Sequence, residues 1–289
     1  MTRKGKVGRP LAQPPRQRSG FHTPRKRLGQ HFLNDSRALD AIVQALGPLD
    51  GKTVIEIGPG RGSLTDRLVE RAGRVIAIEL DRDLAASLRV QHALHPHVQI
   101  VEADVLDVSL GELAGGPYVL VGNVPYYITT PILFHALTPS RADVAVYLVQ
   151  REVADRMGAA PGSKIYGALS VNLQAFADVT FVREVGSRSF TPPPKVESAI
   201  VRVVPRAEAH VEPHLEAPFR SLVIGAFGLR RKQMIRVMRT LTPLDATACE
   251  GLLRDCDIDP MARPETLPHE AFARLTRALA ALGVTLRGS

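Results

Sequence analysis

Three polar side chains, Glu79, Asp104 and Asn123, come at or shortly after the ends of short apolar runs. Carboxylate and amide oxygens accept hydrogen bonds from hydroxyl and amine groups. Because the carboxyl ends of parallel strands meet at the ligand-binding edge of an α/β sheet, we expect the three side chains to face one ligand. We predict that Glu79 holds the ribose of a nucleoside and Asp104 its adenine amine. The alternative is that each acid only caps a helix or lies on the surface.

A glycine-rich turn, Gly58-Pro59-Gly60-Arg61-Gly62, follows the apolar run Val54–Ile57. Glycine lets the backbone turn sharply and approach a ligand closely. Glu79 comes 21 residues after Gly58, the spacing at which an acid accepts hydrogen bonds from ribose in nucleotide-binding units. The G-x-G-x-G spacing differs from the dinucleotide pattern, and Pro59 lacks an N–H for a pyrophosphate. These features favour S-adenosylmethionine as the cofactor, with a turn that binds nothing as the alternative.

The segment Asn123-Val124-Pro125-Tyr126 combines an amide, a stiff turn and an aromatic ring. The exocyclic amine of adenine is a poor nucleophile, because its lone pair is delocalised into the ring. The Asn123 side-chain oxygen and the Val124 carbonyl could accept both N–H hydrogens and draw the nitrogen toward tetrahedral geometry. Pro125 stiffens the turn, and Tyr126 offers an extruded base a stacking face worth about 1–3 kcal/mol. The segment predicts methyl transfer to an adenine amine by alignment, without a general base.

Apolar runs alternate with helical patterns up to Pro205 and predict an α/β domain built on a parallel sheet. Strands are expected near residues 54–57, 75–78, 98–101, 118–121, 144–149, 179–185 and 198–204. Helices are expected after the cap at Asp35 or Ser36, over 82–93, from Pro131, and over 150–158 and 165–177. After Pro205 only helical patterns follow, around 215–223, 230–241, 245–255 and 269–283. We therefore predict a small all-helical second domain over residues 206–289.

Charge is unevenly distributed along the 289 residues. Residues 1–27 hold nine of the 37 lysines and arginines and none of the 29 acidic residues. With several prolines, this tail is expected to be disordered and attracted to polyanions, or simply solvated. The prolines disfavour an amphipathic transit peptide, and no apolar run is long enough to span a membrane. The sequence contains two cysteines, Cys249 and Cys256. So few cysteines are typical of a protein of the reducing cytoplasm, where we expect this protein to act as a monomer.

Four motifs together resemble the bacterial KsgA-type rRNA adenine N6,N6-dimethyltransferases. They are Leu28-Gly29-Gln30-His31-Phe32-Leu33, Glu56-Ile57-Gly58-Pro59-Gly60, Asn123-Val124-Pro125-Tyr126 and Phe190-Thr191-Pro192-Pro193-Pro194-Lys195-Val196-Glu197-Ser198. The resemblance covers about residues 28–240. It implies a Rossmann-like class I methyltransferase core over residues 28–205 and the helical C-terminal domain. It also implies two adjacent adenines in the last hairpin of 16S rRNA, in the small ribosomal subunit, as substrate.

The resemblance also implies roles for individual residues. His31, Leu33 and Gly58 would contact the methionine end of the cofactor. Phe190 would form a second aromatic wall for the target base, held in place by the rigid triproline. The family usually has Leu where this chain has Val124, but the role expected of that position uses only its backbone carbonyl.

Two weaker patterns have structural alternatives. Five basic residues within ten positions could contact rRNA phosphates, or they could form a solvated helix face. They are Arg230, Arg231, Lys232, Arg236 and Arg239. His92, His95 and His97 flank a proline without a neighbouring carboxylate in the sequence, so we expect no metal site there.

Three other functions stay open on the sequence alone. The related large-subunit rRNA methylases of macrolide resistance share much of the pattern, but the Phe-Thr-Pro-Pro-Pro-Lys segment favours the small-subunit type. A DNA adenine methylase would also use Asn-x-Pro-Tyr. The chain could instead act chiefly as an RNA-binding factor in ribosome assembly, although intact Asn123, Tyr126 and Glu79 favour retained catalysis.

Overall fold

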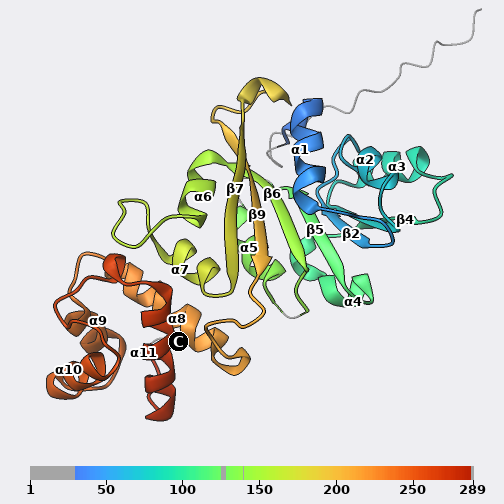
Figure 1. Ribbon diagram of the computed structural model, residues 1–289. Helices are drawn as coiled ribbons and strands as arrows, with labels where there is room; N and C mark the ends of the chain where they lie inside the picture. Colours follow the sequence, from blue (N-terminus) through green and yellow to red (C-terminus); the bar gives the residue numbers. More distant parts are fainter. Residues whose placement is uncertain (1–29, 125–127, 139, 288–289) are drawn as a thin grey trace, which may run out of the picture.

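The computed structural model describes residues 30–124, 128–138 and 140–287, and its centre is a seven-stranded mixed sheet (Figure 1). The strands follow the order β4-β3-β2-β5-β6-β9-β7 across this sheet. Their bounds are β2 Thr53–Ile57, β3 Arg74–Glu79, β4 Val98–Glu102, β5 Tyr118–Asn123, β6 Val144–Gln150, β7 Ala177–Val185 and β9 Ser198–Pro205. All seven strands expected from the sequence are therefore present, with ends shifted by a few residues.

The prediction of a parallel sheet is right for the direction of six strands and wrong for one, β9, which runs opposite to the rest. Strands β4, β3, β2, β5 and β6 pair in parallel, whereas β9 pairs antiparallel with both β6 and β7. The connection from β7 to β9 contains a 3₁₀ turn, Ser187–Ser189, and the short strand β8, Phe190–Thr191, but no α-helix. Without a crossover helix the chain does not return to the starting end of the sheet, and the next strand runs back antiparallel.

The apolar strands are buried because helices cover both faces of the sheet. Successive strand residues point to opposite faces, so Val54 packs with α1 and α2 while Ile55 packs with α4 to α7 on the other side. The helix bounds are α1 Ser36–Leu46, α2 Thr65–Val69, α3 Arg82–Gln91, α4 Leu110–Ala114, α5 Thr129–Ala136, α6 Arg151–Met157 and α7 Ala168–Gln174. This two-sided burial explains why the strands read as nearly continuous apolar runs.

The first helix shows how local sequence sets its own limits. The side chain of Asp35 accepts hydrogen bonds from the N–H groups of Arg37 and Ala38, so Asp35, rather than Ser36, is the N-cap. Gly47, with φ of 80°, ends the helix. Between these limits a stripe that includes Leu39 and Ile42 is buried against the sheet.

The described residues after β9 contain four α-helices, which are coloured orange and red in Figure 1 and lie beside α7. They are α8 Glu216–Gly228, α9 Met234–Leu241, α10 Ala246–Asp255 and α11 His269–Ala281. Helix α9 begins at Met234 rather than near residue 230. A continuous cluster of buried apolar side chains passes from the sheet into these helices, and the Tyr166 hydroxyl donates to the Leu267 carbonyl at 2.9 Å. The division after Pro205 coincides with the end of β9, and two independent domains remain a prediction.

Among the described residues, no helix is both long enough and apolar enough to cross a membrane.

Candidate active site

The glycine turn between β2 and α2 adopts backbone conformations that favour glycine. Gly58, Gly60 and Gly62 have φ values of 66°, 60° and 85°, a region that residues with a Cβ rarely enter. A Cβ on Gly60 would also lie 3.0 Å from the ring of Phe32. The Gly58 N–H donates to the Ile78 carbonyl of β3 at 2.9 Å. The turn is therefore tied to the neighbouring strand, and Gly58 and Gly60 line a cavity at the carboxyl edge of the sheet.

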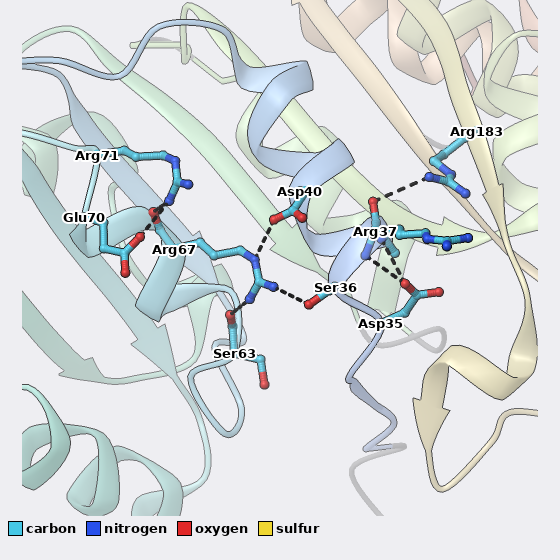
Figure 2. A network of polar contacts seen from close by, with 10 residues as sticks. Asp35, Ser36, Arg37, Asp40, Ser63, Arg67, Glu70, Arg71 and Arg183 are labelled. Carbon is cyan, nitrogen blue, oxygen red and sulfur yellow. Dashed lines mark hydrogen bonds and ion pairs between the residues drawn. The ribbon is translucent and has the colours of Figure 1, made fainter.

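Polar contacts between α1 and α2 hold the helix that follows this turn (Figure 2). Arg67 of α2 donates through Nε to Asp40 and through a terminal nitrogen to the Ser36 hydroxyl, both at 2.8 Å. Its other terminal nitrogen donates to the Ser63 carbonyl at 3.1 Å. One guanidinium thus fixes the exit of the glycine turn relative to α1.

Glu79 is a buried carboxylate at the end of β3, and two backbone N–H groups hold it. Its Oε2 accepts from Gly60 at 3.0 Å and its Oε1 from Asp81 at 2.9 Å. Burial raises the pKa of the Glu79 carboxyl above its ordinary value, and these hydrogen bonds oppose the rise. Each carboxylate oxygen has two lone pairs, so Glu79 keeps acceptor capacity toward the cavity that it lines.

Asp104 lines the same cavity and also caps a short helix. Its Oδ1 accepts the Leu106 N–H at 3.0 Å, at the start of the 3₁₀ helix Val105–Asp107. The helix cap, one of the alternatives drawn from the sequence, is therefore present, and the contact of Asp104 with an adenine amine stays a prediction. A carboxylate has about four acceptor sites, so the cap is compatible with a contact to a bound base.

Asn123 is the last residue of β5, and the segment before β1 (Phe32–Leu33) holds its side-chain amide. The Asn123 Nδ2 donates to the His31 carbonyl at 3.1 Å. Because a carbonyl only accepts, this bond assigns the donor end of the amide and leaves Oδ1 as its acceptor end. Val124, which is 1% exposed, lines the cavity beside Asn123. Pro125 and Tyr126 lie outside the described residues.

The short strands β1 and β8 pair antiparallel and bring two distant motifs to one side of the cavity. His31, just before β1, has its ring Nδ1 2.8 Å from the Pro192 carbonyl, just after β8. Since the carbonyl only accepts, Nδ1 carries the proton in this hydrogen bond. His31 therefore connects the β8 segment through its ring and Asn123 through its backbone.

Leu33 and Phe190 lie opposite each other in this pairing, and neither lines this cavity. Leu33 lines a smaller neighbouring cavity, whose wall shares Gly58, Gly60 and Asn123 with the first. Leu33 and Phe190 are 7% and 2% exposed and pack in the buried cluster around α1. The burial of Phe190 differs from the aromatic wall expected from the sequence. Because side chains alternate along a strand, it is Phe32 that lines the cavity, with the Arg61 guanidinium 4.4 Å from its ring centroid.

Most of the remaining cavity wall is apolar. Besides Phe32 and Val124 it includes Ile57, Ile78, Leu80, Leu84, Ala103, Val105, Ile128 and Ile132. Leu80 directly follows Glu79 and is 48% exposed, so it presents an apolar surface to the cavity beside that carboxylate. Sequence reasoning missed these residues, because apolar residues of a cavity wall and of a core follow the same pattern.

The five basic residues expected to contact RNA divide into two groups. Four are exposed: Arg231, Lys232, Arg236 and Arg239. The fifth, Arg230, forms an ion pair with Glu265 and donates to the Lys164 carbonyl at 2.8 Å. Arg230 thus joins the helical part to the segment before α7.

This cavity fits S-adenosylmethionine. The buried carboxylate of Glu79 matches ribose hydroxyls, the apolar wall matches a purine, and the glycine turn leaves room for close backbone approach. The sheet, the turn and the placed carboxylate together define a Rossmann-like, S-adenosylmethionine-dependent methyltransferase.

Residues 21–280 match the model of the ribosomal RNA adenine dimethylase family, and the chain belongs to this family of S-adenosylmethionine-dependent enzymes. It is 42% identical to ribosomal RNA small subunit methyltransferase A of Chromohalobacter salexigens, over 93% of this chain and 96% of that protein. It is 45% identical to the protein of the same name from Xanthomonas euvesicatoria pv. vesicatoria, over 89% of this chain and 97% of that protein.

Two solved structures support the same fold. A dimethyladenosine transferase from Plasmodium falciparum superposes with a TM-score of 0.78 at 25% identity, over 88% of this chain and 99% of that one. The 23S rRNA methyltransferase ErmE superposes with a TM-score of 0.66 at 29% identity, over 86% and 99%.

Proposed function

We propose that this enzyme dimethylates N6 of two adjacent adenines in the 3′-terminal hairpin of 16S rRNA, during biogenesis of the small ribosomal subunit. The names of the two relatives, ribosomal RNA small subunit methyltransferase A, support this substrate. The observation that carries the chemistry is the amide of Asn123, whose donor end is bound by His31 at the edge of the cofactor cavity. We place the activity in the cytoplasm and assign it to a single chain.

Six residues would hold the cofactor in this proposal. Glu79 accepts from the ribose hydroxyls, and Asp104 accepts from the adenine amine. The turn at Gly58 and Gly60 lets the backbone approach the methionine end. His31 and Leu33 contact that end from the β1 segment, and Leu33 lines a small cavity beside the glycine turn.

The target adenine would meet two acceptors at the end of β5. The Asn123 Oδ1 and the Val124 carbonyl accept the two N6 hydrogens and draw the amine toward tetrahedral geometry. Bound S-adenosylmethionine supplies an electrophilic methyl group on its sulfonium. With the cofactor bound, the N6 lone pair would take up the methyl group as the S–C bond breaks, S-adenosylhomocysteine would leave, and the N6 proton would pass to water. The rate gain comes from alignment of amine, methyl carbon and sulfur.

Aromatic contacts would hold the extruded base. Tyr126, in the segment that follows Asn123 and Val124, supplies one stacking face and Pro125 stiffens its turn. Phe190 supplies the second, and because its ring is 2% exposed, entry of the base requires β8 to shift. Each stacking contact is worth about 1–3 kcal/mol.

The exposed basic residues of the helical part would bind rRNA phosphates. These are Arg231, Lys232, Arg236 and Arg239. Phosphate contacts of this kind supply affinity that falls as salt rises. Arg230, engaged with Glu265, would instead support the position of the patch.

One observation favours a second substrate, the large-subunit rRNA. ErmE, named as a 23S rRNA methyltransferase, shares the fold over 86% of this chain. The relatives named for the small subunit are more similar in sequence, at 42% and 45% identity against 29%. We therefore rank the small subunit first.

A labelling experiment tests the substrate. The full-length protein is incubated with methyl-labelled S-adenosylmethionine and, separately, with undermethylated small subunits, large subunits and duplex DNA. We expect label only in the small subunits, recovered as N6,N6-dimethyladenosine after digestion. Label only in large subunits or only in DNA would contradict the proposal.

A further inference from the structure

The fold brings together two histidines and a glutamate at the junction between the sheet domain and the helical part. His210 lies between β9 and α8, and His269 and Glu270 are the first two residues of α11. One ligand atom from each of the three lies within 4.8 Å of the others. The histidine rings meet edge to face, with centroids 4.9 Å apart. Imidazole nitrogen and carboxylate oxygen are both ligands that Zn²⁺ accepts.

The His269 ring presents a buried nitrogen toward this cluster. Its Nε2 is buried and has no hydrogen-bond partner among the described residues. It nevertheless lies 3.2 Å from the Glu270 Oε1. Two ligand atoms about 2.0–2.1 Å from a tetrahedral Zn²⁺ are separated by about 3.3 Å, so this spacing suits a shared ion. A buried polar atom without a partner is costly, and a metal ion would satisfy it.

The backbone around the cluster is fixed, and the cations beside it are paired. The His210 N–H donates to the Ala175 carbonyl at 3.1 Å, and its carbonyl accepts from Arg277 at 2.6 Å. Arg277 also pairs with Glu212 at 2.7 Å. Arg206 pairs with the carboxylate of Asp178 at 2.8 Å. These pairings reduce the repulsion that a bound cation would meet.

We propose that His210, His269 and Glu270 form a Zn²⁺ site that joins the segment after β9 to the first turn of α11. Three protein ligands leave one tetrahedral position for water. The site is separate from the cofactor cavity, and none of its ligands lines that cavity. Its effect would be to stiffen the junction between the two parts of the chain.

Zn²⁺ titration of the chelator-treated, full-length protein in a non-coordinating buffer tests this site. We expect one Zn²⁺ per chain by calorimetry, visible absorption when Co²⁺ takes its place, and a Tm that rises with Zn²⁺. His210→Ala should weaken Zn²⁺ binding at least about tenfold and abolish the rise in Tm. His214→Ala, an exposed histidine four residues further along the chain, is the matched control and should bind as the parent does.

Three results would overturn the proposal. The first is the absence of stoichiometric Zn²⁺ binding, and the second is unchanged Zn²⁺ binding in His210→Ala. The third is loss of Zn²⁺ binding in His95→Ala, a variant of the histidine group around residues 92–97. Because His210 is only half-buried, its replacement is expected to fold, and the Tm of the metal-free variant checks this directly. Glu270→Gln gives a second variant with the same expectation.

Discussion

Replacing Glu79 by Gln tests the cofactor site with almost no change in shape. The carboxylate accepts two backbone N–H groups, from Gly60 and Asp81, one on each oxygen. In Gln one of those oxygens becomes an NH₂ group, which cannot accept. The variant therefore loses one internal hydrogen bond and leaves a backbone N–H facing a donor. It also loses the charge that strengthens bonds to ribose hydroxyls.

The size of both effects can be worked out separately. Hydrogen bonds to a charged group contribute about 1.5–3 kcal/mol, against about 0.5–1.5 for neutral pairs. Two ribose hydroxyls each losing about 1 kcal/mol give about 2 kcal/mol, or roughly a 30-fold rise in Kd for S-adenosylmethionine. The unpaired backbone N–H costs a further 1–3 kcal/mol, approximately, in the free energy of unfolding. Turnover at saturating cofactor should change little, because Glu79 is placed at the ribose.

Calorimetry with S-adenosylmethionine, together with kcat on small subunits, gives the assay. Glu102→Gln is the matched control. Glu102 lies opposite Glu79 at the end of the neighbouring strand, but it is exposed and pairs with Arg89. The Glu102→Gln variant should bind the cofactor with the same Kd as the parent protein. A Glu79→Gln variant with unchanged Kd, or one that loses kcat alone, would refute the ribose assignment.

Five further variants have defined outcomes. Burial raises the pKa of Glu56 from 4.5 to about 8, so the folded state retains a proton that the unfolded chain loses. The contribution of Glu56 to the free energy of unfolding therefore decreases as pH rises from about 4.5 to 8, and Tm falls with it. Glu56→Gln, which does not titrate, should show a smaller fall in Tm over this pH range. Arg230→Ala should lower Tm with little change in the salt dependence of rRNA binding. Arg236→Ala with Arg239→Ala should keep Tm and reduce the salt slope by about 2. His31→Phe removes the hydrogen bond that its ring donates to the segment after β8 and should raise KM for S-adenosylmethionine, whereas His31→Asn, which keeps a donor, should raise it less.

Periodicity predicts the core elements of this fold well and the direction of the last strand, β9, poorly. The apolar runs that became β2 to β6 and the cap at Asp35 depend on local chemistry, which a sequence displays directly. The antiparallel direction of β9 depends on the connection from β7, where no helix carries the chain back across the sheet. An apolar run gives no indication of direction, so the sequence could not supply it.

The candidate site divides in the same way. Polar residues at strand ends were predictable, and Glu79, Asp104 and Asn123 meet at one cavity. Side-chain positions that depend on pairing between distant segments could not be predicted. Phe190 is turned into the core by its pairing with β1, and Arg230 is engaged by Glu265, which lies 35 residues further along the chain.

The role of Asn123 is the central claim, and one variant tests it most directly. Asn123→Ala removes the acceptor that is proposed to receive an N6 hydrogen, while the exposed basic patch is unchanged. By analogy with loss of a single positioned hydrogen-bonding group in other active sites, methylation of small subunits should fall about 10²–10³-fold. Binding of the variant to the same subunits, measured in parallel, should stay within about twofold of the parent. Equal loss of methylation and binding would contradict the account.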